Sequence, residues 1–471
     1  MSKLIGWAFL AKILIACAIL FSGVGLMPDE AQYWTWSKEL SYGYYSKPCG
    51  IAWQIAFGCL LFGDTEFGVR FGGELLSFFL SIALYRLALH SRLDRKQAFW
   101  SAIAFSFCPL GLFSGFFATT DCAYVLFWTL GAALFMQSRV SFLAIGAVIA
   151  IGVLWKWPLY ALWIPILLFS FRRADFSLFK LLLGMLVSLL GLVPSLIWNL
   201  QYDFPTFHHV AASMNPVHPS QEELGANPLA FIGAQIALVS PILFALLIWQ
   251  FIAVKKPALF CWWTTVLFLG AMLLLSCLKK VQGNWAVAAY PTAFVILLTQ
   301  PLSSPFMRWL KGGIALSVLL VAVLFAFPSL RFNPLRQGLG WQNLDAILLH
   351  SGYNPQTEFL FSDRYQWTSL LSFYGPEQKR AFFLNLSDLR KNQFCYWPSM
   401  RECCLGKDGW FVTFVDPEKA PVVSTWLQTT LQAYFRTVTP TPPVPLTKAK
   451  TVILLHCSDY NGKLPRASSK Y

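Results

Sequence analysis

Residues 178–199 read LFKLLLGMLVSLLGLVPSLIWN, with Lys180 as the one charged side chain. A helix of about 20 apolar residues is long enough to cross the hydrocarbon core of a bilayer. A run of this length and composition therefore predicts a transmembrane helix rather than a helix of a water-soluble core.

Ten further apolar runs lie on either side of this one. They cover about 4–26, 66–89, 98–117, 122–138, 141–155, 158–171, 229–252, 258–277, 286–300 and 312–330. The composition agrees, because 56% of the 471 residues are hydrophobic, 12% are charged and the mean hydropathy is +0.55. A soluble domain carries about 25% charged residues, so this chain is neither a disordered protein, a coiled coil nor a typical soluble enzyme. We predict a mainly α-helical, polytopic membrane protein with about eleven spans.

The chain changes character near residue 330. Residues 1–330 contain 32 charged side chains (about 10%), and residues 331–471 contain 26 (about 18%). The second part has no run of spanning length, but it has short apolar stretches, Phe411–Val415 and Thr451–Leu455, between polar and Pro-rich segments. Such stretches are typical of strands. We predict a transmembrane domain over 1–330, with a first outer loop of about 27–66, and a small soluble α/β or α+β domain over 331–471.

The basic residues predict the orientation of the chain. If the N-terminus is cytoplasmic, thirteen Lys and Arg lie in or beside inside loops and six beside outside loops, as the positive-inside rule requires. The inside set is Lys3, Arg86, Arg92, Arg95, Lys96, Arg139, Arg172, Arg173, Lys180, Lys255, Lys256, Arg308 and Lys311. The outside set is Lys38, Lys47, Arg70, Lys156, Lys279 and Lys280. Lys12, within the first run, could snorkel inward.

Eleven spans then place the C-terminal domain outside the cytoplasm. If 141–155 and 158–171 form one helix instead, that placement reverses. The formal net charge of +14 is on this interpretation largely topological, and we expect membrane lipids rather than nucleic acid as its partner.

An acidic pair opens the first outer loop. Pro28-Asp29-Glu30 directly follows the first apolar run, and an aromatic stretch, Tyr33–Tyr45, comes after it. The aromatic residues are typical of a segment at the membrane surface. Two adjacent carboxylates at the hydrocarbon boundary repel each other and are poorly solvated, which favours a role as general base. The structural alternative is an acid pair at a helix start.

Three more charged residues lie beside apolar runs, where a charge costs free energy because it is poorly solvated. Asp121 lies in a very short loop between apolar runs, where it either caps the next helix or has a functional partner. Lys156 lies between two tryptophans at an outside end, and Lys47 follows Tyr44-Tyr45-Ser46 in the outer loop. Either lysine could snorkel or bind an anion. Lysines and carboxylates that face one cavity would suit phosphate binding with acid–base or metal chemistry.

Three of the six histidines cluster in the loop directly after the 178–199 run. His208 and His209 are adjacent, and His218 lies nearby. Adjacent histidines are a weak sign of a metal site, and surface or packing histidines are the more common case. We keep His208 and His209 as weak candidates for a divalent metal.

Several blocks in this order resemble the GT-C glycosyltransferase superfamily, and most closely its bacterial dolichyl-phosphate-mannose–protein mannosyltransferase-like group, which includes the 4-amino-4-deoxy-L-arabinose lipid A transferase. The blocks cover about residues 25–200. They are Asp29–Trp34, Gly43–Pro48, Phe62–Arg70, Ala118–Asp121, Leu154–Lys156 and Pro194–Asn199.

The resemblance implies a sugar donor carried by a polyprenyl phosphate and transfer with inversion on the outer face of the bacterial inner membrane. The acceptor would be lipid A, another glycolipid or a protein. This fits the chemistry of the compartment, since nucleotide sugars are cytoplasmic and an outward-facing site needs a donor delivered by a lipid.

The resemblance also implies roles for individual residues. Asp29 would be the principal catalytic carboxylate, and Glu30 and Asp121 would shape or charge the same cavity. Lys47 and Lys156 would hold phosphate groups. Further candidates for substrate or phosphate binding stand in the same blocks: Tyr44, Tyr45 and Arg70. In some relatives an acid beside the counterpart of Lys47 helps to bind a metal; Ser46 stands there in this chain, which puts metal dependence in doubt.

Two other functional classes remain open. A transporter or lipid flippase would also have many spans and intramembrane charges. Such proteins usually place charges near the bilayer midplane, in repeated halves, whereas this chain has its acids at the ends of runs and no internal repeat. A non-catalytic scaffold is the third class, and the intact Asp29-Glu30 pair and both lysines argue against it.

Overall fold

The computed structural model describes residues 2–214, 225–252 and 258–470, so His218, Lys255 and Lys256 lie outside it. The chain folds as two compact units, each built from separate segments. Unit 1 comprises Met1–Ser22, Lys47–Trp198 and Ala212–Ala326. Unit 2 comprises Gly23–Ser46, Asn199–Ala211 and Phe327–Tyr471.

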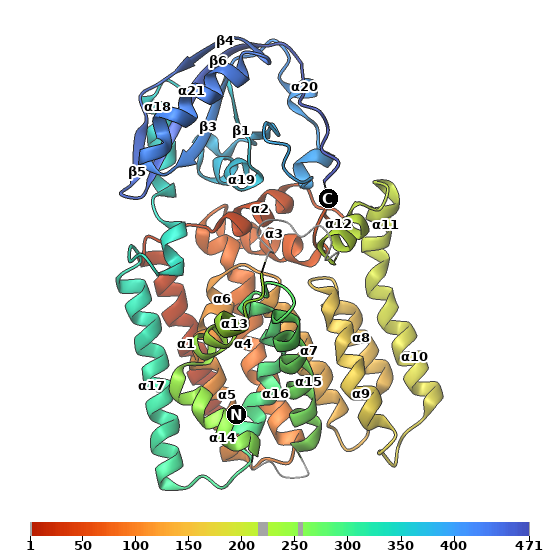
Figure 1. The fold of residues 1–471 in the computed structure, drawn as a ribbon. Coiled ribbons are helices and arrows are strands. Elements are labelled where there is room, and N and C mark those ends of the chain that lie inside the picture. The colour runs from red at the N-terminus through yellow and green to blue at the C-terminus, as the bar shows by residue number, and fades with distance from the viewer. Residues whose placement is uncertain (1, 215–224, 253–257, 471) are drawn as a thin grey trace. The chain divides into compact units, whose positions relative to one another are not determined.

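Unit 1 is helical in its described part (Figure 1). Its α-helices are α1 (Ser2–Phe21), α3 (Gly50–Phe62), α4 (Glu66–His90), α5 (Arg95–Phe107), α6 (Pro109–Phe116), α7 (Asp121–Phe135), α8 (Phe142–Gly152), α9 (Trp163–Ser170), α10 (Leu178–Leu189), α11 (Val193–Gln201), α13 (Pro228–Val239), α14 (Pro241–Ile252), α15 (Leu259–Ser276), α16 (Tyr290–Leu297) and α17 (Ser304–Ala326). Its 3₁₀ helices are η1 (Trp157–Leu162), η2 (Leu190–Leu192) and η4 (Gly283–Ala289). The last residues of α11 pass into unit 2.

A helix lies at each of the eleven predicted apolar runs, and the mainly helical membrane fold is confirmed. By length and apolar composition, five described helices can each cross a membrane: Ser2–Phe21, Glu66–His90, Leu178–Gln201, Leu259–Ser276 and Ser304–Ala326. The number rises to seven if each of two bent pairs is one span. The count of eleven therefore stays a prediction.

Proline explains both bent pairs. Pro109 starts α6 after α5 ends at Phe107, and the two helices meet at 59°. Pro241 starts α14 after Ser240, whose φ is 81°, and α13 and α14 meet at 104°. Proline lacks a backbone N–H and is tolerated only in the first turn of a helix. The 229–252 run, read as a single span, is thus a sharply broken helix.

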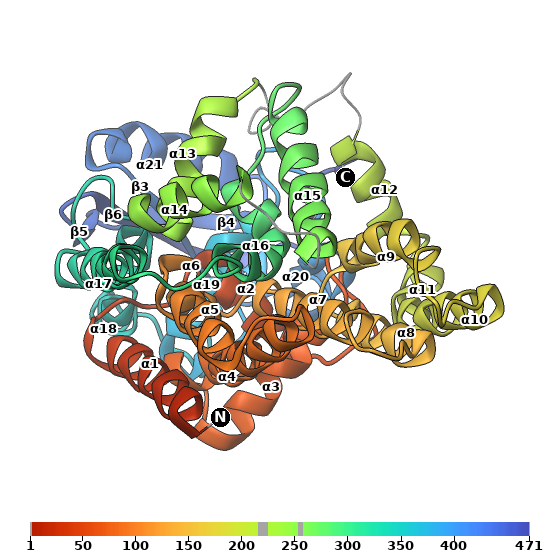
Figure 2. The same cartoon turned by 90° about the horizontal axis from the view of Figure 1, so that it is seen from below.

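Helix α4 lies at the centre of unit 1 and contacts α1, α3, α5, α6 and α7. Beyond α7 the row continues through α8 to α10, as the view along the helices shows (Figure 2). Glycines bring α8 and α10 close, because a Cβ on Gly146 would lie 2.1 Å from the Gly184 carbonyl oxygen. Small residues at such contacts are typical of membrane helices.

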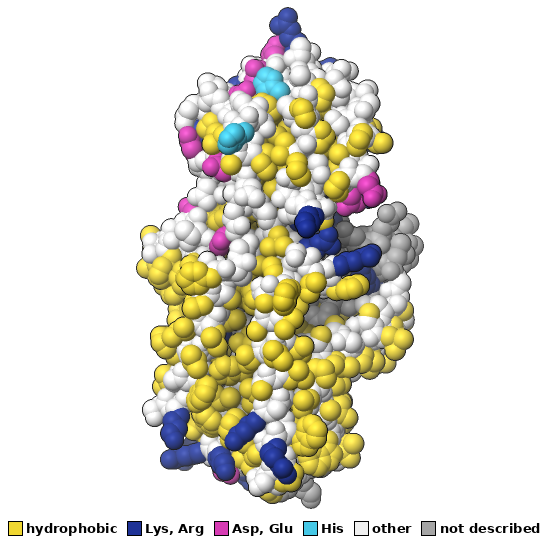
Figure 3. All heavy atoms as spheres, turned by 90° about the vertical axis from the view of Figure 1, so that its left-hand side faces the viewer, with side chains coloured by type: hydrophobic (Ala, Val, Ile, Leu, Met, Phe, Trp, Pro, Cys, Tyr) yellow, Lys and Arg dark blue, Asp and Glu magenta, His cyan; other side chains and the backbone are white. Residues whose placement is uncertain are grey.

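The outer surface of unit 1 is apolar. Figure 3 shows hydrophobic side chains spread over the helical part, with Lys and Arg gathered at its lower end, where Figure 1 places the N-terminus. Exposed residues on the described helices include Phe9 and Phe21 of α1 and Phe179 and Leu186 of α10. A water-soluble protein rarely exposes so large an apolar surface, which fits an integral membrane protein.

Unit 2 contains a mixed sheet, which confirms the predicted C-terminal α/β or α+β character. The strands are β1 (Phe359–Ser362), β2 (Phe382–Phe383), β3 (Gly409–Val415), β4 (Phe435–Pro440), β5 (Val444–Thr447) and β6 (Lys450–Tyr460). Their order is β2-β1-β3-β6-β4, and β5 also pairs with β6. β1 runs parallel to β2 and β3, and β6 runs antiparallel to β3, β4 and β5.

The helices of unit 2 complete its core. They are α2 (Pro28–Lys38), α12 (Pro205–Met214, shared with unit 1), α18 (Leu344–His350), α19 (Tyr365–Tyr374), α20 (Met400–Cys403) and α21 (Ala420–Leu431), with 3₁₀ turns η5 (Pro334–Gly338), η6 (Trp341–Asn343), η7 (Pro376–Gln378), η8 (Gln393–Tyr396) and η9 (Pro417–Lys419). Phe361 and Phe411 pack edge to face at 5.4 Å in a core that includes Leu427 of α21.

The segment predicted as the first outer loop is mostly helical. It forms α2 and α3, which belong to different units. α2 packs on α19, where Trp34 meets Phe373 edge to face at 5.0 Å between ring centroids. The Leu26 amide donates to the Tyr374 hydroxyl at 2.6 Å. These contacts fix the acidic start of α2 within unit 2.

Candidate active site

Two distant segments of unit 1 converge on Asp121. Lys156 Nζ donates to Asp121 Oδ1 at 2.5 Å, and Asn284 Nδ2 donates to Asp121 Oδ2 at 2.8 Å. The lysine and aspartate side chains are each 17% exposed. Both carboxylate oxygens therefore have donors, and the lysine sits at the edge of solvent rather than in the core. Two of the predicted site residues are thus direct partners.

Local structure explains how Asp121 and Lys156 reach each other. Asp121 begins α7, and Lys156 stands in an extended conformation between α8 and η1. One turn along α7, the Tyr124 ring lies 5.2 Å from Lys156 Nζ, a distance at which an aromatic face attracts a cation. The acid at the helix start is also favoured by the helix dipole.

The segment that carries Lys47 is attached to the same region. The Gly50 amide donates to the Leu154 carbonyl at 2.6 Å, and Trp155 Nε1 donates to Gln54 Oε1 at 2.8 Å. Lys47, which is half-buried, lies three residues before Gly50. The start of α3 therefore packs directly against the Leu154–Lys156 segment, and we call this contact the seam. The segments that carry Lys47 and Lys156 meet at this contact.

Arg70 is the fourth predicted residue in unit 1. It is fully buried on α4, and its Cζ lies 4.3 Å from the Phe116 ring centroid. A guanidinium that stacks on an aromatic ring is held in one orientation. Its predicted role in substrate binding stays a prediction.

The acidic pair lies in the first turn of α2, in unit 2, and its two members differ. Glu30 is 1% exposed, and its Oε2 accepts the Met27 amide at 2.9 Å in a capping box. Asp29 is exposed. The Glu30 carboxylate thus stabilises the helix start, while Asp29 presents its carboxylate at the surface of the unit.

The two predicted tyrosines are buried in unit 2. The Tyr44 ring stacks on Trp36 at 4.6 Å, and its hydroxyl lies 3.0 Å from the Trp36 carbonyl oxygen. The Tyr45 amide donates to Gln393 Oε1 at 2.7 Å. Both residues hold the loop against the C-terminal part of the unit, and a contact with substrate stays a prediction for each.

His208 and His209 lie on α12, and the His209 ring is 4.9 Å from Tyr45. Among the described residues, the group that could hold a metal is instead Glu358, Asp408 and His456. That group includes no predicted site residue. Among the residues that the structure describes, His208 and His209 belong to no group that fits a metal site, and we derive no catalytic step through a metal.

Sequence reasoning missed a buried ion pair in unit 1. Lys12, expected to snorkel inward, donates to Ser77 Oγ at 2.6 Å and lies 3.9 Å from Glu74. Glu74 is 6% exposed. The reason is helix packing: α1 lies against α4, and pairing inside the bundle lets both charges stay in it.

Comparison with known proteins agrees with the sequence blocks. Residues 46–198 match the family described as dolichyl-phosphate-mannose-protein mannosyltransferase. The chain is 28% identical over 309 residues to the lipid A galacturonosyltransferase RgtD of Rhizobium johnstonii, covering 62% of this chain and 63% of that protein. It is 26% identical over 223 residues, 41% of each chain, to the undecaprenyl phosphate-alpha-4-amino-4-deoxy-L-arabinose arabinosyl transferase of Pseudomonas savastanoi pv. phaseolicola.

The fold is similar to that of a solved structure over almost its whole length. ArnT from Cupriavidus metallidurans, bound to undecaprenyl phosphate, superposes with a TM-score of 0.63 at 15% identity, covering 95% of this chain and 98% of that one. The sequence match to the curated galacturonosyltransferase spans less than two thirds of that protein. The predicted resemblance is confirmed: residues 46–198 are similar to the dolichyl-phosphate-mannose-protein mannosyltransferase family, and the fold is similar to that of ArnT.

Proposed function

We propose that this protein is a glycosyltransferase of the bacterial inner membrane that moves a sugar from a polyprenyl-phosphate donor to an extracytoplasmic acceptor, with inversion. Lipid A or another glycolipid is the acceptor we favour over a protein, because the relatives are named for lipid A and for an undecaprenyl-phosphate-linked arabinose. The convergence of Lys156, Asp121, Asn284 and the Lys47 segment carries the proposal.

The proposed chemistry assigns the phosphate to the lysines. Lys47 and Lys156 hold the donor phosphate, and Asp121 holds the Lys156 ammonium in place. The acceptor hydroxyl attacks the anomeric carbon, its proton passes to Asp29, and the bond from that carbon to the phosphate oxygen breaks. Polyprenyl phosphate leaves with the bonding electron pair, and the two cations stabilise its charge.

The proposed topology has about eleven spans and a cytoplasmic N-terminus, with residues 1–330 as the membrane domain and 331–471 as an extracytoplasmic domain. The gathering of Lys and Arg at the lower end of unit 1 supports it (Figure 3). Basic residues are enriched on the cytoplasmic side of membrane proteins.

One observation favours a transporter or flippase as a second candidate. Lys12 and Glu74 form an ion pair inside the helical unit, and intramembrane charges are common on transport pathways. The comparisons favour the transferase, since the relatives are named as glycosyltransferases.

Mass spectrometry of envelope glycolipids and glycoproteins tests the proposal. Cells that express Asp29→Asn should lose a sugar-sized mass from lipid A or another glycolipid that wild-type cells carry. Asp345→Asn is the matched control, because Asp345 is also an exposed acid in the first turn of a helix in unit 2. A loss on a protein instead would move the acceptor to protein, and no change in either pool would favour the transporter.

A further inference from the structure

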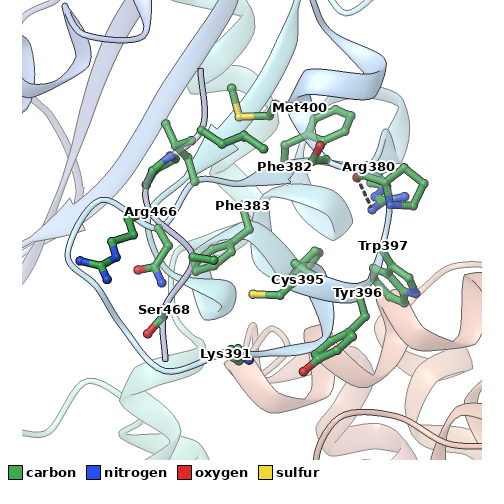
Figure 4. Close-up of a pocket in the computed structure, with 18 residues that line it drawn as sticks. Arg380, Phe382, Phe383, Lys391, Cys395, Tyr396, Trp397, Met400, Arg466 and Ser468 are labelled. Atoms are coloured by element: carbon green, nitrogen blue, oxygen red, sulfur yellow. Dashed lines mark hydrogen bonds between the residues drawn. The ribbon is translucent and has the colours of Figure 1, made fainter. Parts of the chain in front are cut away.

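Unit 2 contains a pocket with no part in the proposed transfer step. Its cavity of about 330 Å³ lies between β2, the Phe394–Met400 segment and residues 464–468 of the C-terminal tail (Figure 4). All of its lining residues belong to unit 2. Small-molecule pockets have volumes of about 300–1,000 Å³, so this one has room for a single sugar ring.

Aromatic side chains form a rigid frame around the pocket. Phe394 and Trp397 meet edge to face at 5.4 Å, and Phe383 lies 6.4 Å from Phe394. The Arg380 guanidinium lies 5.1 Å from the Trp397 ring and donates to the Pro398 carbonyl at 3.1 Å. Rings fixed in this way offer flat apolar faces at little entropic cost, and the C–H face of a sugar ring can stack on such a surface.

Three cations line the pocket, and two of them face acids: Arg380 pairs with Glu39 at 3.0 Å, and Arg466 interacts electrostatically with Asp388. Arg380, Lys391 and Arg466 line it, and none of its 18 described lining residues is an aspartate or glutamate. Figure 4 shows Arg466 and Ser468 on one side of the pocket and Arg380 and Trp397 on the other. Asp388, an acid close to this region, is paired with Lys470 at 2.9 Å. Cations beside apolar aromatic rings suit a ligand in which an anionic group is attached to a sugar ring.

We propose that this pocket binds the phosphorylated sugar headgroup of the acceptor glycolipid. The phosphate binds Lys391, and the sugar ring packs on the aromatic frame. The acceptor is favoured over the donor because the donor phosphate already has Lys47 and Lys156 in unit 1. The source of the ligand rests on the proposed function, whereas the chemistry of the pocket does not.

Direct binding tests the chemistry. The full-length protein in lipid nanodiscs is titrated with glucosamine 1-phosphate, glucosamine or inorganic phosphate, and binding is followed by isothermal titration calorimetry. We expect glucosamine 1-phosphate to bind most tightly, and Lys391→Ala to weaken it about tenfold, as for the loss of one charge-assisted hydrogen bond. Trp397→Leu should weaken the sugar phosphate more than inorganic phosphate.

Lys463→Ala is the matched control, since Lys463 is an exposed cation one residue outside the lining. Equal weakening by Lys463→Ala and Lys391→Ala would overturn the site, and so would equal binding of glucosamine and its phosphate. This assay needs no transferase activity, so it decides the pocket's chemistry even if the proposed function fails.

Kinetics test the source of the ligand. In an active preparation, Lys391→Ala should raise KM for the acceptor about tenfold and leave KM for the donor and kcat unchanged. A rise in donor KM alone would assign the pocket to the donor and overturn the proposal.

Discussion

Among single residues, Lys47 gives the sharpest test of phosphate binding. Lys47→Ala should raise KM for the donor about tenfold or more, because an ammonium–phosphate contact is already present in the ground state. Initial rates against the concentration of each substrate measure this. Lys38→Ala is the control, since Lys38 is an exposed cation at the end of α2 that lies 5.1 Å from the Trp34 ring. An unchanged KM for the donor would contradict the role.

Asp363 gives a prediction about stability. It follows β1 in unit 2, and burial raises the pKa of its carboxyl above the ordinary value of 3.8. Ionisation therefore opposes folding, and the free energy of unfolding falls as the pH rises from that ordinary value through the raised pKa. Asp363→Asn should raise the apparent Tm by a few degrees at pH 7 and have less effect near pH 4.

Thermal unfolding of the detergent-solubilised chain at several pH values measures this difference. Asp345→Asn, at an exposed position, serves as the reference and should leave Tm nearly unchanged. An Asp363→Asn variant that is less stable than wild type at pH 7 would show that the carboxylate has a stabilising partner.

The sequence predicted Asp121 and Lys156 as site residues, but it did not predict that they are partners of each other. A charged side chain beside apolar runs costs free energy, and the neighbouring sequence alone shows that cost for each residue. Which charge neutralises which depends on how helices far apart in the chain pack, and the same is true of Lys12 and Glu74. Asn284 joins Asp121 from 163 residues away, so no local spacing could assign it.

At the scale of elements, the seam between α3 and the Leu154–Lys156 segment depends on Gly50. A Cβ there would lie 2.5 Å from the Trp155 ring and 2.7 Å from the Leu154 carbonyl oxygen. Gly50→Ala should therefore push the segment away, with a cost of about 1–3 kcal/mol for overpacking. We expect lower transfer activity and a lower Tm, because both lysine-bearing segments would shift.

Gly270→Ala in α15 is the matched control, since nothing lies within 4 Å of a Cβ at that position. Alanine favours a helix over glycine, so this variant should be neutral or slightly more stable. Equal activity and Tm for both variants would show that the seam does not position the site.

The helices could be predicted because an apolar run long enough to span a membrane almost always forms a transmembrane helix. Their breaks at Pro109 and Pro241 follow from proline, yet the angles of 59° and 104° depend on packing. The stretch after the first run was read as an outer loop, but α3 within it is itself apolar. Its 13 residues were too short to count as a span by length alone.

For the whole molecule, the candidate residues divide between the two units. Lys47, Arg70, Asp121 and Lys156 belong to unit 1, whereas the acidic pair, the two tyrosines and the two histidines belong to unit 2. The boundary between Ser46 and Lys47 falls inside one of the sequence blocks. A sequence block is defined by residues that are consecutive in the chain, whereas a compact unit is defined by contacts in space. No sequence motif could therefore reveal that division.

The side of the membrane on which the C-terminal domain lies is the last prediction. Cys403 lies on α20 in unit 2 and is exposed. With a cytoplasmic N-terminus and an odd number of spans, a thiol reagent that does not cross membranes should label Cys403 in intact spheroplasts. Arg139→Cys, at an exposed position in a predicted inside loop, should be labelled only after permeabilisation. Peptide mapping by mass spectrometry separates these sites from the other cysteines. If Cys403 reacts only after permeabilisation, the number of spans is even, and an outward-facing transfer step could not use Asp29 of the same unit.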